Sequence, residues 1–326
     1  MISRILSCGF ALALLAGCSR QDSTSGSSLT SDGGKIGVLL VSHGSHSENW
    51  RKMLFDVEHR VRDEVLADAN IAGIESAFME YTEPSIATRL KEFDAGGYSD
   101  VIIVPVLLTV SGHSFDDIPV IAGQREDPAT AAHLKLEKIE TYKPRANVTL
   151  TPLLDFPDVL RKNVIRRAAR MSREPEDEGL VLVAYGSEAY HDEWKALMDE
   201  IGQAATSELG LARSRHAWCG HIARYKPEPT EQAIREILRE QERALVVPVL
   251  VAVDETFQGR IIGGAIENVN QPERIEYRHD AVLPDENVDR WVVEASREHA
   301  ARIAGGEAVA KVAAEQLETE GSEAAE

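Results

Sequence analysis

Residues 37–45 read GVLLVSHGS, and residues 179–187 read GLVLVAYGS. Each stretch is a short apolar run rich in Val and Leu that ends in small and polar residues. Such a run is typical of a strand buried on both faces of a parallel sheet, followed by a turn. The likeness of two stretches 142 residues apart predicts that the chain contains an internal duplication.

Two further pairs of segments support the duplication. VIIVPVLLTV begins at Val101 and lies over ALVVPVLVAV from Ala244, while EPSIATRL from Glu83 lies over EPTEQAIR from Glu228. The offsets of 143 and 145 residues are close to the first one. The last unit matches loosely, with a shorter offset that implies an insertion in the first half between residues 124 and 144.

Alternation of short Val- and Ile-rich runs with longer amphipathic stretches predicts an α/β fold built from βα units. The strands expected in the first half are 36–42, 73–78, 100–107 and 147–152, and the helices are 49–67, 84–95, 117–132 and 157–171. The polar run SREPEDEG at residues 172–179 predicts a linker. We therefore expect two lobes with parallel sheets, at residues 35–172 and 173–304.

The N-terminal end has the pattern of an export signal. Arg4 precedes an apolar stretch of residues 5–15, which is too short to span a bilayer comfortably. The run LAGC at residues 15–18 resembles the lipobox of bacterial lipoproteins, so we expect a signal peptide at 1–18 and a lipid on Cys18. Residues 19–34 then predict a flexible tether. This interpretation places the protein outside the cytoplasm, anchored to a membrane on the periplasmic or cell-surface side; a simple signal peptide is the alternative.

Composition excludes several classes of function. The 54 acidic and 35 basic residues give a net charge of −19, which argues against nucleic acid as a partner. Cys219 is the one thiol beyond the signal, so the folded body holds no disulfide. Residues 305–326 carry six Glu and one Lys and predict an acidic tail without chemistry.

Polar residues follow the first three predicted strands. His43, Glu80 and His113 stand where ligands bind in open α/β sheets, outside the carboxyl ends of the strands. Two imidazoles and one carboxylate suit Co²⁺, Fe²⁺, Ni²⁺ or Zn²⁺, and nothing in the set selects one metal. The aligned residues of the second half are Tyr185, Tyr225 and Thr256, so we expect one metal site per chain, in the first lobe.

Three motifs in order carry a family resemblance. HGS follows the first strand, FMEYTEPS begins at Phe78, and VPVLLTVSGHSFDDIP begins at Val104. Together they resemble the sirohydrochlorin chelatases, the CbiX-like class II chelatases. The resemblance implies two flavodoxin-like lobes facing a tetrapyrrole cleft, and ATP-independent insertion of Co²⁺ or Fe²⁺ into sirohydrochlorin. It also transfers the family's metal ligands onto His43, Glu80 and His113. The export signal departs from a family whose pathway is usually cytoplasmic.

The resemblance implies a mechanism in which His43 and His113 deliver the metal and Glu80 acts as ligand or base. The metal is a substrate, and no tightly bound cofactor is expected. Because imidazole must be deprotonated to ligate, activity is expected to fall below about pH 6.5. The alternative function is an exported carrier of metal or tetrapyrrole without turnover. The duplication favours a monomer.

Other residues near the motifs have weaker predicted roles. Gly44 and Ser45 suit either a tight turn or contact with a substrate carboxylate. Trp50 is a candidate to line the macrocycle cleft or to pack, and His46 is a candidate auxiliary contact. The remaining assignments are local cations at Arg51, Lys52 and Arg89, helix-start carboxylates at Glu83, Asp116 and Asp117, and packing or a second metal site at His216, Cys219 and His221.

Overall fold

The computed structural model of the protein describes residues 34–107, 112–153 and 156–305. The predicted signal peptide and lipid site, nearly all of the predicted tether and nearly all of the predicted acidic tail lie outside these residues. Among the described helices, none has the length and apolar character needed to cross a membrane.

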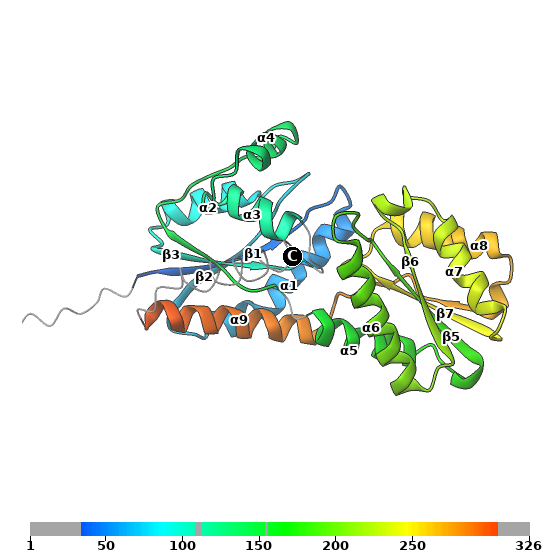
Figure 1. Ribbon diagram of the computed structural model, residues 1–326. Helices are drawn as coiled ribbons and strands as arrows, with labels where there is room; N and C mark the ends of the chain where they lie inside the picture. The colour runs from blue at the N-terminus through cyan, green and yellow to red at the C-terminus, as the bar shows by residue number, and fades with distance from the viewer. Residues whose placement is uncertain (1–33, 108–111, 154–155, 306–326) are drawn as a thin grey trace, which may run out of the picture. The chain divides into compact units, whose positions relative to one another are not determined.

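The described strands form two parallel sheets of four strands each (Figure 1). The first sheet has the order β2-β1-β3-β4, and the second has the same order, β6-β5-β7-β8. The strands of the first sheet are β1 (Ile36–Ser42), β2 (Ile71–Phe78), β3 (Asp100–Pro105) and β4 (Asn147–Leu150). Those of the second sheet are β5 (Glu178–Ala184), β6 (Arg213–Trp218), β7 (Arg243–Val249) and β8 (Ile275–Tyr277).

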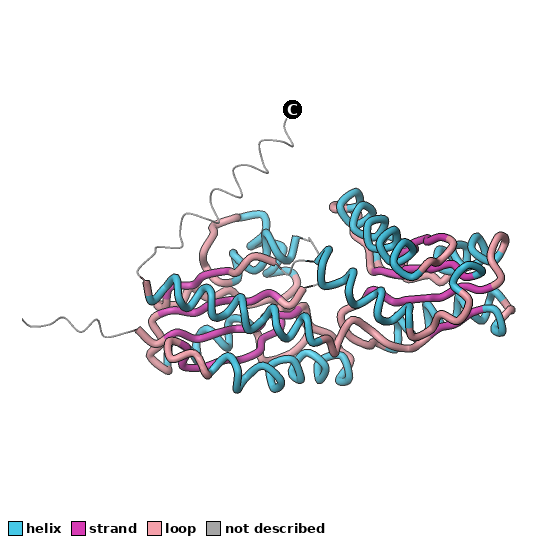
Figure 2. Tube along the Cα trace, turned by 90° about the horizontal axis from the view of Figure 1, so that it is seen from below, coloured by secondary structure: helices cyan, strands magenta, loops and turns pink. Residues whose placement is uncertain are grey.

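Helices cover both faces of each sheet, as the tube view shows (Figure 2). This is the α/β, two-lobe architecture expected from the alternating pattern. The helices of the first half are α1 (Glu48–Leu66), α2 (Ile86–Ala95), α3 (Ile118–Ile121), α4 (Pro128–Leu136) and α5 (Phe156–Ala169), with a π-helical turn, η1 (His113–Asp117), before α3. The helices of the second half are α6 (His191–Leu209), α7 (Glu228–Leu238), α8 (Gly264–Val269) and α9 (Glu286–Ala304), with a π-helical segment, η4 (Glu255–Gly263), before α8.

The central strand β1 is apolar on both faces because it is covered on both. Val38 and Leu40 lie in the core with α1 and α9, whereas Leu39 and Val41 lie in a second core with α2 and α3. Side chains that alternate along a strand point to opposite faces, so one uninterrupted apolar run supplies both cores. This double burial fixes the register and therefore the place where β1 ends, next to the candidate site.

One predicted helix is wrong. The sequence pattern predicts a single helix at 117–132, but the chain leaves the helical conformation after Ile121 and begins again at Pro128. Gly123 adopts a φ of +66°, and a Cβ at that position would lie 2.6 Å from Cβ of Lys143. Asp127 then caps α4 by accepting from Ala129 N at 2.9 Å. A left-handed glycine and a new N-cap end one helix and begin another.

The two lobes exchange their last helices. Helix α5 follows β4 in the chain but packs against α6 and β7 of the second lobe. Helix α9 follows β8 but packs against α1 and β3 of the first lobe (Figure 1). The division at residues 172 and 173 separates the two sheets, but neither 35–172 nor 173–304 contains all the helices that cover its own sheet.

Candidate metal centre

The three predicted ligands lie together at the carboxyl edge of the first sheet. His43 follows β1, Glu80 follows β2, and His113 begins η1 in the connection after β3. Since β1 lies between β2 and β3, the ends of three neighbouring parallel strands bring these residues to one place.

The geometry of this group fits one metal ion. Each residue offers one ligand atom, and the three atoms lie within 4.8 Å of one another. The rings of His43 and His113 meet edge to face, with centroids 4.8 Å apart. All three side chains are partly buried. Three protein ligands leave coordination positions open, as in sites where a metal reacts or exchanges, whereas structural sites are closed.

The backbone around Gly44 sets the distance between the first two ligands. The amide of Glu80 donates to the carbonyl of His43 at 2.9 Å. Gly44 has a φ of +105°, and a Cβ there would lie 2.1 Å from the carbonyl oxygen of Glu80. Only glycine allows this close approach of the two loops. Gly44 therefore has a structural role that the sequence presents only as a tight turn.

Asp117 holds the ring of His113. Its Oδ2 lies 2.7 Å from His113 Nδ1, and the residue is buried at 8% exposure. The expected capping role is wrong for Asp117, since its side chain makes no cap hydrogen bond to α3. A carboxylate that accepts from Nδ1 leaves Nε2 as the free nitrogen of the imidazole and orients it.

The pKa values of the two histidines move in opposite directions. Burial disfavours the charged form of both rings. For His113, the hydrogen bond and the charge of Asp117 outweigh burial and raise its pKa above the ordinary 6.5. For His43, burial and the neighbouring His113 lower the pKa. His43 Nδ1 lies 3.1 Å from the carbonyl oxygen of Gly44, so its Nε2 is also the nitrogen left for a ligand.

Tyr81 belongs to the site, although the sequence analysis does not select it. Its ring stands between those of His43 and His46, with centroid distances of 5.9 and 4.8 Å. Burial and a hydrogen bond with the Glu80 carboxylate raise the pKa of Tyr81 to about 12. The side chain is 57% exposed and its φ is +67°, which is unusual for a bulky residue. Its position directly after Glu80 is the sequence signal that points to it.

Trp50 is not in the site. It is 8% exposed and belongs to the core of the first lobe, where its ring packs 6.3 Å from that of Phe78. It lies in the first turn of α1, so the periodicity that buries the helix also buries this ring. The expected contact with a macrocycle is therefore corrected to packing. Ser45 is partly buried, and its Oγ donates to Asp254 Oδ2 at 3.2 Å.

The cations predicted near the site are already engaged. Arg51 donates to the carbonyl of Ser45 at 2.8 Å, Lys52 pairs with Asp56, and Arg89 pairs with Glu92. These groups stabilise the scaffold of the first lobe. Glu83 accepts from the amide of Ser85 at 2.6 Å at the start of α2, which agrees with its predicted structural role.

The aligned positions of the second lobe hold no metal ligands. Tyr185 Oη lies 3.0 Å from Tyr225 Oη, and Thr256 lies in η4. Among the described residues, His43, Glu80 and His113 form the one group with metal-binding spacing. His216, Cys219 and His221 are not such a group: His216 pairs with Asp199, Cys219 is fully buried, and His221 bonds Tyr225. Burial raises the pKa of the Cys219 thiol to about 12.

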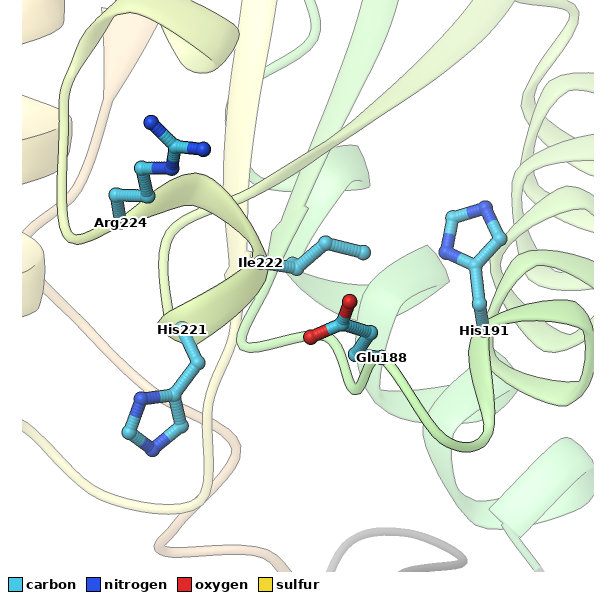
Figure 3. Close-up of a pocket in the computed structure, with 5 residues that line it drawn as sticks. All are labelled: Glu188, His191, His221, Ile222 and Arg224. Carbon is cyan, nitrogen blue, oxygen red and sulfur yellow. The ribbon is translucent and has the colours of Figure 1, made fainter.

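A pocket in the second lobe has His221, the histidine that bonds Tyr225, in its lining (Figure 3). It has a volume of about 370 Å³ and is lined by Glu188, His191, His221, Ile222 and Arg224. Figure 3 shows Glu188 and Ile222 between His191 on one side and His221 and Arg224 on the other. None of His43, Glu80 and His113 lines this pocket.

The chain is similar to known chelatases. Residues 37–171 match the family model CbiX. The sirohydrochlorin cobaltochelatase of Methanothermobacter thermautotrophicus is 37% identical over 89 residues, which are 27% of this chain and 59% of that protein. That of Saccharolobus islandicus is 25% identical over 132 residues, 40% of this chain and 92% of that protein. The matches to the relatives from Methanothermobacter thermautotrophicus and Methanococcus maripaludis span 59% and 57% of those proteins.

Solved structures share the fold. SirB from Bacillus subtilis with Fe³⁺ superposes with a TM-score of 0.62 at 17% identity, covering 83% of this chain and 98% of SirB. The sirohydrochlorin chelatase SirB from Bacillus subtilis subspecies spizizenii in complex with cobalt gives a TM-score of 0.58 at 16% identity. The match covers 83% of this chain and 97% of that SirB. Both likenesses extend over the two lobes, beyond the residues that the family model matches. The first lobe is thus similar in sequence to the CbiX family, and the two described lobes together share the fold of the solved chelatases.

Proposed function

We propose that the protein inserts a divalent metal, Co²⁺ or Fe²⁺, into sirohydrochlorin or a related tetrapyrrole without ATP. The observation that carries the proposal is the group of His43, Glu80 and His113, whose ligand atoms lie within 4.8 Å of one another. The curated relatives named sirohydrochlorin cobaltochelatase support the choice of substrate.

The histidines suit a site that binds a metal and then gives it up. Their Nδ1 atoms are occupied by Gly44 O and Asp117 Oδ2, so both Nε2 atoms remain to hold the incoming ion. Two imidazoles and a carboxylate replace part of the water shell of the ion and leave positions for the nitrogens of the macrocycle. A closed structural site holds its ion with four protein ligands. This group has three, so the ion can still be transferred to the macrocycle.

Glu80 is the group we propose to take up one of the two protons that leave the pyrrole nitrogens as the metal enters. An ionised carboxylate beside the metal accepts a proton at Oε when the ion moves from the protein to the macrocycle. The neighbouring Tyr81, whose pKa the Glu80 carboxylate helps to raise, is placed to orient this carboxylate. Glu80 thus takes up one of the two pyrrole protons, and the second passes to a histidine freed of the metal, so that two protons replace the two charges of the departing ion.

The test follows metal insertion by the protein from Ser19 onward, with sirohydrochlorin and Co²⁺ or Fe²⁺ under anaerobic, nucleotide-free conditions. Absorption spectroscopy measures the rate for the wild type, His113→Ala and His133→Ala. His133 is an exposed histidine on α4 and is the matched control. Several turnovers that are lost only in His113→Ala support the proposal. Equal rates in all three proteins would overturn it.

A carrier is the second candidate function, and the lipobox-like run that ends at Cys18 favours it, because it indicates an exported protein. A carrier binds Co²⁺ through the same three residues but gives no insertion rate above the uncatalysed background. Calorimetric titration with Co²⁺ beside the turnover assay separates the two functions.

We also propose that the chain is a monomer held outside the cytoplasm by a lipid on Cys18. Labelling of cells with a radioactive fatty acid checks the anchor, with Cys18→Ser as the variant expected to lose the label. Light scattering measures the molecular mass of the protein from Ser19 onward. The mass of one chain is expected, and twice that mass would count against a monomer.

A further inference from the structure

The carboxyl edge of the second sheet carries an aromatic cluster where the first sheet carries metal ligands. The ring of Phe257 lies 5.5 Å from that of Tyr185 and 6.2 Å from that of Tyr225. The hydroxyls of the two tyrosines bond each other, and His221 extends the network through Tyr225. Tyr225 is 43% exposed, although a large ring in a satisfied network has enough apolar surface to be buried. The cluster therefore exposes part of the Tyr225 side chain to solvent.

Cations border this aromatic cluster. Arg224 directly precedes Tyr225 and lines the pocket of Figure 3, and Arg260 donates to Oγ1 of Thr256, the neighbour of Phe257, at 2.6 Å. In the part of the chain that the structure describes, neither guanidinium pairs with a carboxylate. Most other arginines do so, as expected for a protein with a net charge of −19. Two unpaired guanidiniums beside an exposed ring are suited to a planar anion.

The loops that carry the cluster meet those that carry the metal ligands. Ser45, two residues after His43, donates to Asp254, two residues before Thr256. Tyr225 stands at the position that aligns with Glu80, which directly precedes Tyr81. Both tyrosines follow their strands with left-handed backbone, at φ of +67° and +55°. Such strained conformations in bulky residues cost energy and concentrate where a ligand is held.

We propose that the second lobe holds the macrocycle through Tyr225, Phe257, Arg224 and Arg260 while the first lobe supplies the metal. This rests on the proposed function and assigns the substrate contacts within it. The aromatic rings pack against the flat face of the tetrapyrrole, and the two arginines bind its peripheral carboxylates. Of the first-lobe cations near the metal ligands, Lys52 and Arg89 pair with carboxylates and Arg51 holds the carbonyl of Ser45. The second lobe thus carries substrate contacts in place of metal ligands.

The experiment measures binding of uroporphyrin, a soluble polycarboxylate porphyrin, to the protein from Ser19 onward without metal. Quenching of tryptophan fluorescence gives the Kd for the wild type, Arg224→Gln and Arg260→Gln. Arg239→Gln is the matched control, because Arg239 is an exposed arginine at the end of α7. Each site variant is expected to weaken binding about three- to fivefold at low salt. The control is expected to stay at the wild-type Kd, and added salt reduces the difference.

Two further variants separate the ring from the charges. Tyr225→Asn removes the ring and tolerates the left-handed backbone, and it is expected to weaken binding about fivefold, whereas Tyr225→Phe stays near the wild type. Glu188→Gln removes a carboxylate from the neighbouring pocket and is expected to strengthen binding of the anion about twofold.

The outcomes are distinguishable from those of the proposed function. Co²⁺ binding, measured by calorimetry, is expected to be unchanged in all these variants, which also shows that they are folded. Loss of porphyrin affinity equal in Arg239→Gln and Arg224→Gln, or no loss in either site variant, would overturn the inference. A failure of the wild type to insert metal would reject the proposed function while leaving these affinities measurable.

Discussion

Asp117 Oδ2 lies 2.7 Å from His113 Nδ1, and this carboxylate is buried beside a ligand-bearing turn. The two residues are four positions apart in η1, where one turn brings them to the same side. The pair leaves Nε2 as the free nitrogen of His113. It is therefore expected to link the metal affinity of the candidate site to a residue outside the group of ligands.

Asp117→Asn is expected to weaken Co²⁺ binding by about 10- to 100-fold while leaving the fold intact. The amide is nearly the same size, but it holds the imidazole less firmly and no longer increases the basicity of its free nitrogen. Calorimetric titration with Co²⁺ measures the loss. Asp116→Asn is the matched control, since Asp116 pairs with Arg125 and not with His113. An unchanged affinity in Asp117→Asn would show that the ring needs no support.

Metal binding is expected to weaken as the pH falls, with the midpoint above the ordinary histidine pKa of 6.5. Asp117 raises the pKa of His113, so a proton competes with the metal at this ring up to a higher pH. The pKa of His43 is lowered, so His43 is already neutral in that range. Below the midpoint, one competing proton costs about tenfold in affinity per pH unit.

Titrations of Co²⁺ at a series of pH values check this dependence. The same series on Asp117→Asn is expected to move the midpoint to lower pH, because the group that raises the pKa of His113 is gone. Affinity that stays flat between about pH 5 and 8 would exclude histidine ligands.

Gly44→Ala is expected to destabilise the protein by at least about 2 kcal/mol and to lower Co²⁺ affinity about tenfold. The new Cβ would collide with the carbonyl of Glu80 and push two ligand-bearing loops apart. Gly97→Ala is the matched control: Gly97 also has a positive φ, +72°, but no atom lies within 4 Å of the added Cβ. We expect it to cost about 1 kcal/mol and to leave metal binding unchanged.

Chemical denaturation and Co²⁺ titration of both glycine variants provide the measurements. If Gly44→Ala and Gly97→Ala behave alike, backbone strain alone explains the glycine, and the close approach of the Glu80 loop is irrelevant to the site.

Asp285→Ala is expected to lower the free energy of unfolding by about 3 kcal/mol. The carboxylate of Asp285 is buried, and it accepts from Asn163 and Arg166 of α5, both at 2.6 Å, and from Asn287 N at the start of α9. It joins the two helices that the lobes exchange. Asp289→Ala, which removes a partly exposed pair with Arg60, is the control and is expected to cost less than about 1 kcal/mol.

The pH dependence of stability gives an independent check on Asp285. Burial raises the pKa of its carboxyl, but the hydrogen bonds from Asn163 and Arg166 outweigh this and lower the pKa below the ordinary 3.8. The contribution of Asp285 to the free energy of unfolding is therefore present above pH 3.8. It is lost as the pH falls through the lower pKa of the folded state. Urea unfolding at several acidic pH values is expected to show this loss in the wild type and a weaker one in Asp285→Ala.

Much of the fold follows from local pattern. The runs at 36–41 and 179–184 are apolar without alternation, a composition typical of a strand that is covered on both faces. The candidate ligands could be predicted for the same reason: His43, Glu80 and His113 stand after apolar runs, and the ends of neighbouring parallel strands meet. The broken helix after Ile121 could not be predicted as easily, because the close approach of Lys143 to Gly123 comes from a distant part of the chain.

The sequence by itself determined the α/β class, the repeat of strand-ending motifs and the choice of three candidate ligands, since each depends on residues near one another in the chain. Only the tertiary structure decided that α5 and α9 cover the opposite lobes, that Asp117 supports His113 and that Trp50 is buried. The physical reason is that the local sequence shows only that an apolar helix face or a carboxylate needs a partner. It does not show which partner that is. Which surface buries a face, and which donor satisfies a carboxylate, depend on the packing of the whole chain.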